Sequence, residues 1–400
     1  MTPSAADPRR LLLTGRVVTP EGVVGDGAVA VEGARVAYAG ARASLPQVWV
    51  DVAEPDGWQA GLTLLPGLVD LHCHGGNGGE FGPDPASAHR AARHHHQHGT
   101  TTIVGSLVSA PATTLLEGAR TLGDLVRSGE LAGIHLEGPF LSTARCGAQN
   151  PAALVDADVA LVEALADAAG DGAFAQMTWA PERTGGDEVP AALAAVGAVG
   201  AVGHTDADFD TTARALDAVA ASGVRGGLPL TTHLFNGMPP LLSRSPGAVG
   251  AAIAAAARGQ AVVEVIADGV HLDGGTVRML FDTVGPEHLA LVSDAMSASG
   301  LPDGAYTLGG LDVTLSGRAV RLTGNGSLAG GVSTLLDQVR WLVHDLGIPL
   351  VDAVAAASAT PARALALAGS GSLAPGQHAD LLVVDSQLVL QRVLRHGSWL

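Results

Sequence analysis

The chain has 400 residues, of which 47% are apolar and 15% charged, and its 22 basic and 39 acidic residues give a net charge of −17 at pH 7. So acidic a chain is not expected to bind nucleic acid or an anionic membrane, and so little charge argues against disorder. All 22 basic residues are arginines. The absence of lysine excludes Schiff-base lysines, P-loop lysines and a carbamylated lysine bridging two metals.

Cysteine content and hydropathy indicate the compartment. Cys73 and Cys146 are the only cysteines, too few for a disulfide framework, and a reducing compartment is expected. Arg9 and Arg10 precede only three leucines, which is too short for a secretory signal. The longest apolar stretch, residues 248–257, is too short to span a bilayer. We therefore expect a cytoplasmic protein without membrane contacts.

Along the chain, β-rich runs are followed by a repeated strand–helix pattern. Short strands are predicted at residues 11–22, 27–40 and 48–62, where glycine and proline separate the runs. Eight apolar runs then alternate with Ala-rich helical segments, with an average period of about 31 residues, the size of a (β/α)8 unit. The runs cover residues 65–74, 101–109, 132–140, 175–182, 199–207, 228–236, 261–269 and 289–296.

The remaining segments complete the fold prediction. Residues 301–331 are glycine-rich and predict hairpins, and helices are expected over 332–347 and 349–368, the second interrupted by Pro361. The tail, residues 371–400, is again strand-like. We therefore predict an α/β fold: a TIM-like (β/α)8 barrel over residues 61–373, beside a small β-sandwich domain formed by residues 1–60 and 374–400.

Histidines and carboxylates stand at the carboxyl-terminal ends of five of the eight predicted barrel strands. Because the carboxyl ends of barrel strands meet at one mouth, imidazoles and carboxylates there predict a divalent-metal site with an open water position. In the first run, two-residue periodicity puts both imidazoles on one face and turns Cys73 away. The residues are His72 and His74 in the first run, Glu137 in the third, His204 in the fifth, His233 in the sixth and Asp294 in the eighth.

We expect the site to hold one or two ions. His72 and His74 offer a second metal position, which stays empty if the enzyme works with one metal. Without lysine, Glu137 is the natural bridge between two metals. Asp294 would accept a proton from water activated by the metal and return it to the leaving amine. These ligands suit zinc first, and also iron, cobalt or manganese.

Several motifs also resemble one known family. PGLVDLHCHGG, HLEGPF, VGHT, THLFNGMP, DGVH, VSDAM and SLAGG are similar in sequence and order to those of N-acetylglucosamine-6-phosphate deacetylases in the amidohydrolase superfamily, over nearly the whole chain. The resemblance implies that Glu137, His204 and His233 hold the principal metal, that the two histidines of the first run complete a second site and that Asp294 is the acid/base. It implies hydrolysis of N-acetylglucosamine 6-phosphate to glucosamine 6-phosphate and acetate.

The resemblance also implies substrate contacts in the loops around the mouth. In the family, the arginine matching Arg244 reaches the sugar phosphate of the neighbouring subunit, which implies a homodimer. A guanidinium suits this role because it binds phosphate with two parallel hydrogen bonds. The implied contacts are Ala148, Gln149, Asn236, Gly237, Arg244, His271, Leu328, Ala329 and Gly330.

Two positions depart from the family pattern. After HLEGPF the family carries Gly-Ala-His, whose histidine contacts the substrate near the amide, whereas this chain has Gln149. Glutamine donates a hydrogen bond but cannot be cationic. An alternative function is therefore deacetylation of a different or unphosphorylated N-acyl amino sugar, and a third is a binding protein that has lost catalysis. Gly237 stands where alanine is usual and keeps the backbone N–H.

A run of histidines, His94, His95, His96 and His98, ends the predicted helix before the second barrel strand. Gly99 is placed as its C-terminal cap, and the imidazoles lie near the negative end of the helix dipole. We interpret the run as part of the helix and not as a metal site.

Overall fold

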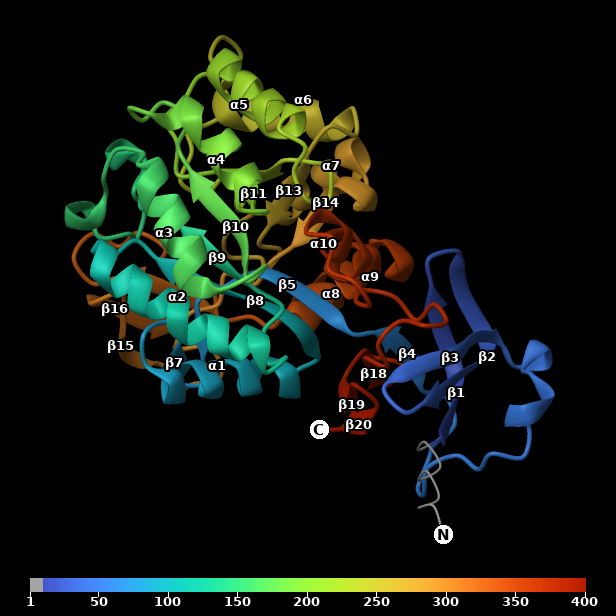
Figure 1. Cartoon of the computed structure of the whole chain (residues 1–400). Coiled ribbons are helices and arrows are strands. Elements are labelled where there is room, and N and C mark those ends of the chain that lie inside the picture. The colour runs from blue at the N-terminus through green and yellow to red at the C-terminus, as the bar shows by residue number, and fades with distance from the viewer. Residues whose placement is uncertain (1–9) are drawn as a thin grey trace.

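The computed structural model describes residues 10–400, so residues 1–9 of the predicted small domain lie outside the described residues. Parallel strands form a barrel and helices cover its outside (Figure 1). Each of the eight predicted barrel runs overlaps one of these strands. They are β5 (Leu68–Cys73), β8 (Thr100–Val108), β9 (Gly133–Glu137), β10 (Phe174–Trp179), β11 (Val199–Val202), β12 (Leu230–Thr231), β13 (Val262–Val265) and β14 (Leu289–Leu291).

The barrel closes between its first and last strands. The sheet runs from β5 through β8 to β14 in chain order, with parallel neighbours. Past β14, the N–H of Asp294 donates to the carbonyl of His72 at 2.9 Å, and the N–H of His74 donates to the carbonyl of Ala295 at 2.8 Å. The predicted (β/α)8 architecture is therefore confirmed.

Helices pack on the barrel through small apolar side chains, as the alanine-rich composition predicts. The last helix closes the amino-terminal end of the barrel: Leu365 packs with Val69 and Val104 from the interior, and Thr360 donates to the carbonyl of Pro286, just before β14. The helices are α1 (Pro85–Gln97), α2 (Ala112–Arg127), α3 (Val159–Ala169), α4 (Val189–Ala195), α5 (Phe209–Ala221), α6 (Gly247–Ala257), α7 (Gly274–Val284), α8 (Leu335–His344), α9 (Leu350–Ala357) and α10 (Ala359–Ala364).

The predicted interruption at Pro361 appears as the break between α9 and α10. α9 ends at Ala357, four residues before Pro361, and Ser358 separates the two helices. A proline ring clashes with the carbonyl four residues earlier, so the break falls before the proline and not at it.

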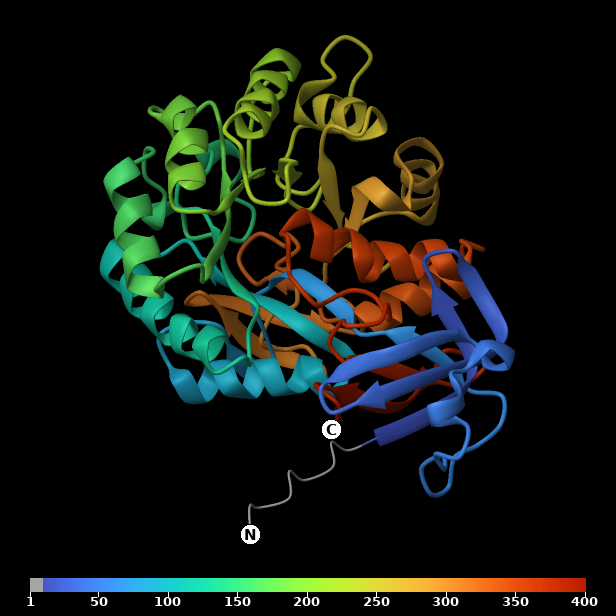
Figure 2. The same ribbon diagram turned by 45° about the vertical axis from the view of Figure 1, so that its right-hand side comes forward.

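Strands from both ends of the chain form a second sheet beside the barrel (Figures 1 and 2). Its edge strand β3 (Arg35–Ala41) returns to the segment before β18: the N–H of Val36 donates to the carbonyl of Gln377 at 3.0 Å. The sheet thus folds over its own apolar core. Its other strands are β1 (Arg10–Thr19), β2 (Gly22–Glu32), β4 (Thr63–Pro66), β18 (Leu381–Val384), β19 (Leu390–Arg395) and β20 (Ser398–Trp399). The boundaries near residues 60 and 374 stay predictions.

The strand predicted over residues 48–62 is wrong. The chain forms a short 3₁₀ helix there, η2 (Gln47–Trp49), followed by loops. Val48 and Val50 are 68% and 53% exposed, whereas Trp49 is buried with the Arg10 guanidinium 4.0 Å from its ring centroid. One buried tryptophan anchors this segment, so the apolar residues around it do not mark a strand.

Hairpins follow the barrel strands as predicted. The glycine-rich segment after β14 folds as a three-stranded antiparallel sheet. The hairpin strands are β15 (Gly304–Leu308), β16 (Leu311–Ser316) and β17 (Ala319–Leu322), with β6 (Gly75–Gly76) and β7 (Gly79–Glu80) after β5. The other 3₁₀ helices are η1 (Arg42–Ser44), η3 (Thr143–Arg145), η4 (Pro151–Ala153), η5 (Gly186–Glu188) and η6 (Pro286–His288).

Over residues 10–400, no helix has the length and apolar character needed to cross a membrane.

Candidate metal centre and active site

The six predicted strand-end side chains meet at the carboxyl-terminal mouth of the barrel. His204, His233 and Asp294 all have left-handed backbone conformations, with φ of 47°, 26° and 45°. Such conformations are costly for residues other than glycine and collect at functional sites. They direct these three side chains away from the normal strand alternation and towards the mouth.

Glu137 lies between two histidine pairs. Its Oε1 is 2.9 Å from Nε2 of His204 and 2.9 Å from Nε2 of His233. Its Oε2 is 3.1 Å from Nε2 of His74. Within the pairs, the Nε2 atoms of His204 and His233 are 3.1 Å apart, and those of His72 and His74 are 3.0 Å apart. Oε1 of Glu137 also lies 3.6 Å from Nε2 of His72, so one carboxylate contacts both pairs.

Hydrogen bonds on the far side of the imidazoles orient these histidines. Nδ1 of His204 donates to the carbonyl of Arg145 at 2.8 Å, and Nδ1 of His74 donates to the carbonyl of Ser106 at 3.2 Å. Such an imidazole would bind a metal in its neutral form, with Nδ1 donating and the Nε2 lone pair on the ion, which is the usual arrangement of metal-binding histidines.

Glu264 on β13 holds the remaining imidazole of the first strand, and sequence reasoning missed it. Its Oε2 lies 3.3 Å from Nδ1 of His72 and 3.3 Å from the N–H of His233, and its Oε1 accepts from Gln176 at 2.5 Å. Glu264 is fully buried. A single charged residue inside the apolar run VVEV was the signal that could have found it.

Burial and charge compete at the carboxylates of the site. Burial by itself would raise the pKa of Glu137, but the imidazoles of His72 and His204 outweigh it and hold the pKa well below its usual range. Burial likewise opposes ionisation of Asp294, but His72 and His74 keep its pKa below the ordinary value. Both carboxylates are therefore negatively charged.

The imidazoles respond in the opposite direction. Burial would lower the pKa of His74, yet contacts with Asp294 and Glu137 outweigh burial and raise it to about 9. Asp294 Oδ1 is 3.4 Å from Nε2 of His74 and 3.5 Å from Nε2 of His72. The mouth of the barrel thus favours positive charge.

This donor set fits a divalent cation. The ligand atoms of His72, His74 and Glu137 lie within 4.8 Å of one another, as do those of Glu137, His204 and His233. Imidazole nitrogens gathered around a carboxylate are the ligands that zinc and similar transition metals take. Buried groups arranged in this way would be costly without a positive charge among them.

A cavity of about 300 Å³ opens beside these ligands. Its floor contains Glu137, His204, His233 and Asp294 with His74, whereas His72 is buried behind them. Most of the predicted substrate contacts line its walls, together with Val108, Leu308 and Ser327, which sequence reasoning missed. The predicted contacts in the wall are Ala148, Gln149, Asn236, Gly237, His271, Leu328 and Gly330.

Gln149 links the cavity wall to the ligand set. Its Nε2 donates to Oε2 of Glu137 at 2.5 Å, and its Oε1 accepts from the N–H of Ser109 at 2.8 Å. Gly237 gives His204 room, because a Cβ at its φ of +61° would lie 2.8 Å from Nδ1 of His204. His271 is fixed by Asp268, whose Oδ2 accepts from its Nδ1 at 2.8 Å.

Two predicted contacts lie outside the cavity wall of the chain. Ala329 is fully buried, and its N–H donates to the carbonyl of Val320 at 3.0 Å, so only its neighbours Leu328 and Gly330 face the cavity. Arg244 is exposed on the loop between β12 and α6 and does not line the cavity. Leu241 and Leu242 on the same loop are 48% and 58% exposed.

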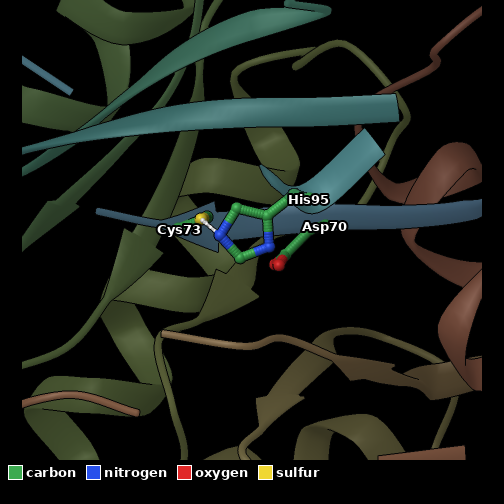
Figure 3. A group of neighbouring side chains, drawn as sticks. All are labelled: Asp70, Cys73 and His95. Atoms are coloured by element: carbon green, nitrogen blue, oxygen red, sulfur yellow. Dashed lines mark hydrogen bonds between the residues drawn. The ribbon is translucent and has the colours of Figure 1, made fainter. Parts of the chain in front are cut away.

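His94, His95 and His96 belong to α1, as predicted, and His98 is its C-cap, but the imidazoles of the first three are neutral. Burial lowers the pKa of His94 to about 3 and those of His95 and His96 to about 4, so an interaction of charged imidazoles with the helix dipole is not present. Figure 3 shows Cys73 and Asp70 of β5 around the ring of His95. Nε2 of His95 lies 3.1 Å from Sγ of Cys73, so Cys73 faces α1 and not the metal ligands, as the strand periodicity predicts.

Comparisons with known proteins give the family of the chain. A sequence model described as the amidohydrolase family matches residues 63–398. An N-acetylglucosamine-6-phosphate deacetylase from Lysinibacillus sphaericus is 32% identical over 349 residues, 84% of this chain and 85% of the relative. An N-acetylgalactosamine-6-phosphate deacetylase from Escherichia coli O157:H7 is 31% identical, over 90% of this chain and 92% of the relative. The structure of a mutant N-acetyl-D-glucosamine-6-phosphate deacetylase from Mycobacterium smegmatis, in complex with N-acetyl-D-glucosamine-6-phosphate, is 39% identical with a TM-score of 0.89, covering 98% of this chain and 99% of that chain.

Proposed function

The chain belongs to the amidohydrolase family, among the N-acetylglucosamine-6-phosphate deacetylases, and on that premise we propose that it hydrolyses the acetamide of N-acetylglucosamine 6-phosphate. The products are glucosamine 6-phosphate and acetate. The observation that carries the proposal is the convergence of Glu137, His204, His233 and Asp294 on one cavity. That combination supplies ligands for a divalent ion and a separate carboxylate for proton transfer.

Glu137, His204 and His233 would hold the principal ion, and His72 and His74 would hold a second one together with Glu137. Zinc is the first choice of metal for these ligands, and iron, cobalt and manganese share them. When bound, a divalent ion polarises the acetamide carbonyl and makes water more acidic. Because Glu137 lies between the two pairs of histidines, it can take the role of a carbamylated lysine that bridges two metals, which this chain lacks.

Asp294 transfers the proton in this mechanism. Its ionised carboxylate takes a proton from the attacking water as the water oxygen bonds to the acetamide carbon. The same carboxyl group then gives the proton to the amide nitrogen as the C–N bond breaks. The amine and acetate leave, and Asp294 is again ionised. Its lowered pKa supports the first of these steps, which needs the ionised form.

The sugar phosphate is recognised by a few placed groups, because the overall charge of −17 repels an anion. Asn236 and His271 face the cavity from two loops, and the backbone around Gly330 completes the wall. Arg244 lies away from the cavity of its own chain, and we propose that it contacts the phosphate in the neighbouring subunit of a homodimer. The exposed Leu241 and Leu242 beside it support an interface at this loop. The two free cysteines support a cytoplasmic location.

Gln149 supports a second candidate function. Where the family carries a histidine near the amide, this chain places a neutral amide that also donates to Glu137. A neutral donor changes the stabilisation of the developing oxyanion. Deacetylation of a different or unphosphorylated N-acyl amino sugar is therefore the alternative, and the relatives include an N-acetylgalactosamine-6-phosphate deacetylase.

Acetate release from a panel of sugars tests the proposal. The metal-loaded enzyme is given N-acetylglucosamine 6-phosphate, N-acetylgalactosamine 6-phosphate and unphosphorylated N-acetylglucosamine. We expect the highest kcat/KM on the first sugar. Equal turnover of the unphosphorylated sugar would remove the role of Arg244. Failure to hydrolyse any N-acetyl sugar would favour a binding protein that has lost catalysis.

A further inference from the structure

A second group of metal-binding side chains lies at the other end of the barrel. His378 and Asp380 precede β18, and His396 forms the turn between β19 and β20. Their ligand atoms lie within 4.8 Å of one another. The neighbouring residues Thr101 and Thr102 lie at the start of strand β8, directly after Thr100, so the group lies at the amino-terminal end of the strands. We propose that His378, Asp380 and His396 bind a divalent transition-metal ion, independently of the proposed catalytic site.

Asp380 is the buried centre of this group. The residue is 5% exposed, and its Oδ1 accepts from the N–H of His396 at 2.6 Å. Its Oδ2 is buried and has no hydrogen-bond partner within the part of the chain that the structure describes. An unpaired buried carboxylate oxygen costs free energy. A cation bound at the Asp380 carboxylate would offset the cost of burying it.

The backbone holds both imidazoles close to Asp380. His396 has a left-handed φ of +48°, a conformation that costs a residue other than glycine about 1 kcal/mol or more. Its Nδ1 lies 3.6 Å from Oδ1 of Asp380. His378 packs on Gly369, where a Cβ would lie 2.9 Å from the imidazole, and the two histidine rings have centroids 5.0 Å apart. The three ligands are therefore arranged before any ion binds.

Two arginines lie beside this group: Arg395 lines the same cavity as His378 and His396, and Arg35 pairs with His378 through the backbone. Both arginines donate to backbone carbonyls, Arg395 to Thr101 at 3.0 Å and Arg35 to Gly376 at 3.2 Å. Because their charge repels a cation, we expect this site to fill after the catalytic one.

The chemistry of the site selects its ligand. Two imidazoles and one carboxylate bind zinc, cobalt, nickel or ferrous iron. An anion would meet the Asp380 carboxylate, so the arginines alone do not make an anion site. A cavity of about 220 Å³, lined by His378 and His396 with Thr102 and Ser370, leaves room for water ligands. An ion here would fasten the β19–β20 turn to the start of β18.

Counting zinc ions in the full-length enzyme tests this proposal. Wild type, H396N, H378Q and a control variant are dialysed against buffered Zn²⁺, and bound zinc is measured per chain. Asparagine suits position 396 because it tolerates a left-handed backbone. The control is H89N, which removes an exposed histidine paired with a single carboxylate, Glu130.

We expect wild type and H89N to bind one zinc ion more than H396N and H378Q, with unchanged deacetylase turnover in all four. Zn²⁺ should also raise the Tm of wild type further than that of either variant. Equal zinc content in wild type, H396N and H378Q would overturn the proposal. Because this experiment counts bound ions and does not measure activity, a negative result would not contradict the proposed deacetylase activity.

Discussion

The carboxylate of Glu264 holds the imidazole of His72 from inside the barrel, with Oε2 3.3 Å from Nδ1. The same oxygen lies 3.3 Å from the N–H of His233. Glu264 therefore contacts residues of both proposed metal positions while lying behind them. Carboxylates that accept from the far nitrogen of a metal-binding histidine fix its ring and raise its basicity.

Replacing Glu264 with glutamine should weaken metal binding. The substitution turns one acceptor oxygen into an N–H donor that faces the donors of His72, His233 or Gln176. We expect metal affinity to fall about 10- to 100-fold, the usual effect of losing such a partner. Competition with a fluorescent chelator measures the affinity. Glu117 is exposed on α2, and E117Q is the matched control. Unchanged affinity in E264Q would show that Glu264 does not support the ligands.

Removal of Arg244 should weaken recognition of phosphate. A lost charge-assisted contact of about 1.5–3 kcal/mol corresponds to a rise in KM of about 10- to 100-fold. We expect this rise for N-acetylglucosamine 6-phosphate in R244A, with little change for the unphosphorylated sugar. The control is R258A, which removes another exposed arginine. If R244A left the KM for the phosphorylated sugar unchanged, Arg244 would not be the phosphate ligand.

His96 should make the fold sensitive to acid. Burial and the positive charge of Arg395 lower its pKa from 6.5 to about 4, so the unfolded chain binds a proton between these values that the folded chain does not. Stability is therefore present above pH 6.5 and lost as the pH falls towards 4. In metal-free protein, the unfolding free energy of wild type should lose about 2 kcal/mol relative to H96Q between pH 7.5 and pH 5. Urea titrations at both pH values measure the difference, and a constant difference would contradict the assignment.

The barrel could be predicted because its signals are local and repeated. Each apolar run is followed by an alanine-rich helix at a near-constant period, and short apolar runs of this kind suit strands buried on both faces. The segment around Trp49 lacked such a repeat. Its valines are exposed on either side of one buried ring, and sequence alone does not distinguish that arrangement from a strand.

The proposed ligands were predictable because they lie at strand ends, whereas the contacts of the supporting residues were not. Glu264 and Gln176 lie within strands, and their contact with each other joins β13 to β10. Only the register of the closed barrel brings Glu264 under His72. Sequence alone could not tell that Leu328 and Gly330 line the cavity and Ala329 does not, because the conformation of the loop decides which residues face it. The proposed role of Arg244 depends on a second subunit, which one chain does not contain.

Acetate release by wild type and D294N tests the central claim most directly, because it separates metal binding from proton transfer. Each protein is stripped with a chelator, reloaded with zinc and assayed on N-acetylglucosamine 6-phosphate, with bound metal measured in the same samples. We expect stripped wild type to be inactive and reloaded wild type to recover. D294N should keep its metal and lose about 10²- to 10⁴-fold in kcat, the contribution of a general acid–base. Substantial turnover by D294N, or by the stripped enzyme, would contradict metal-dependent deacetylation with Asp294 as the proton carrier.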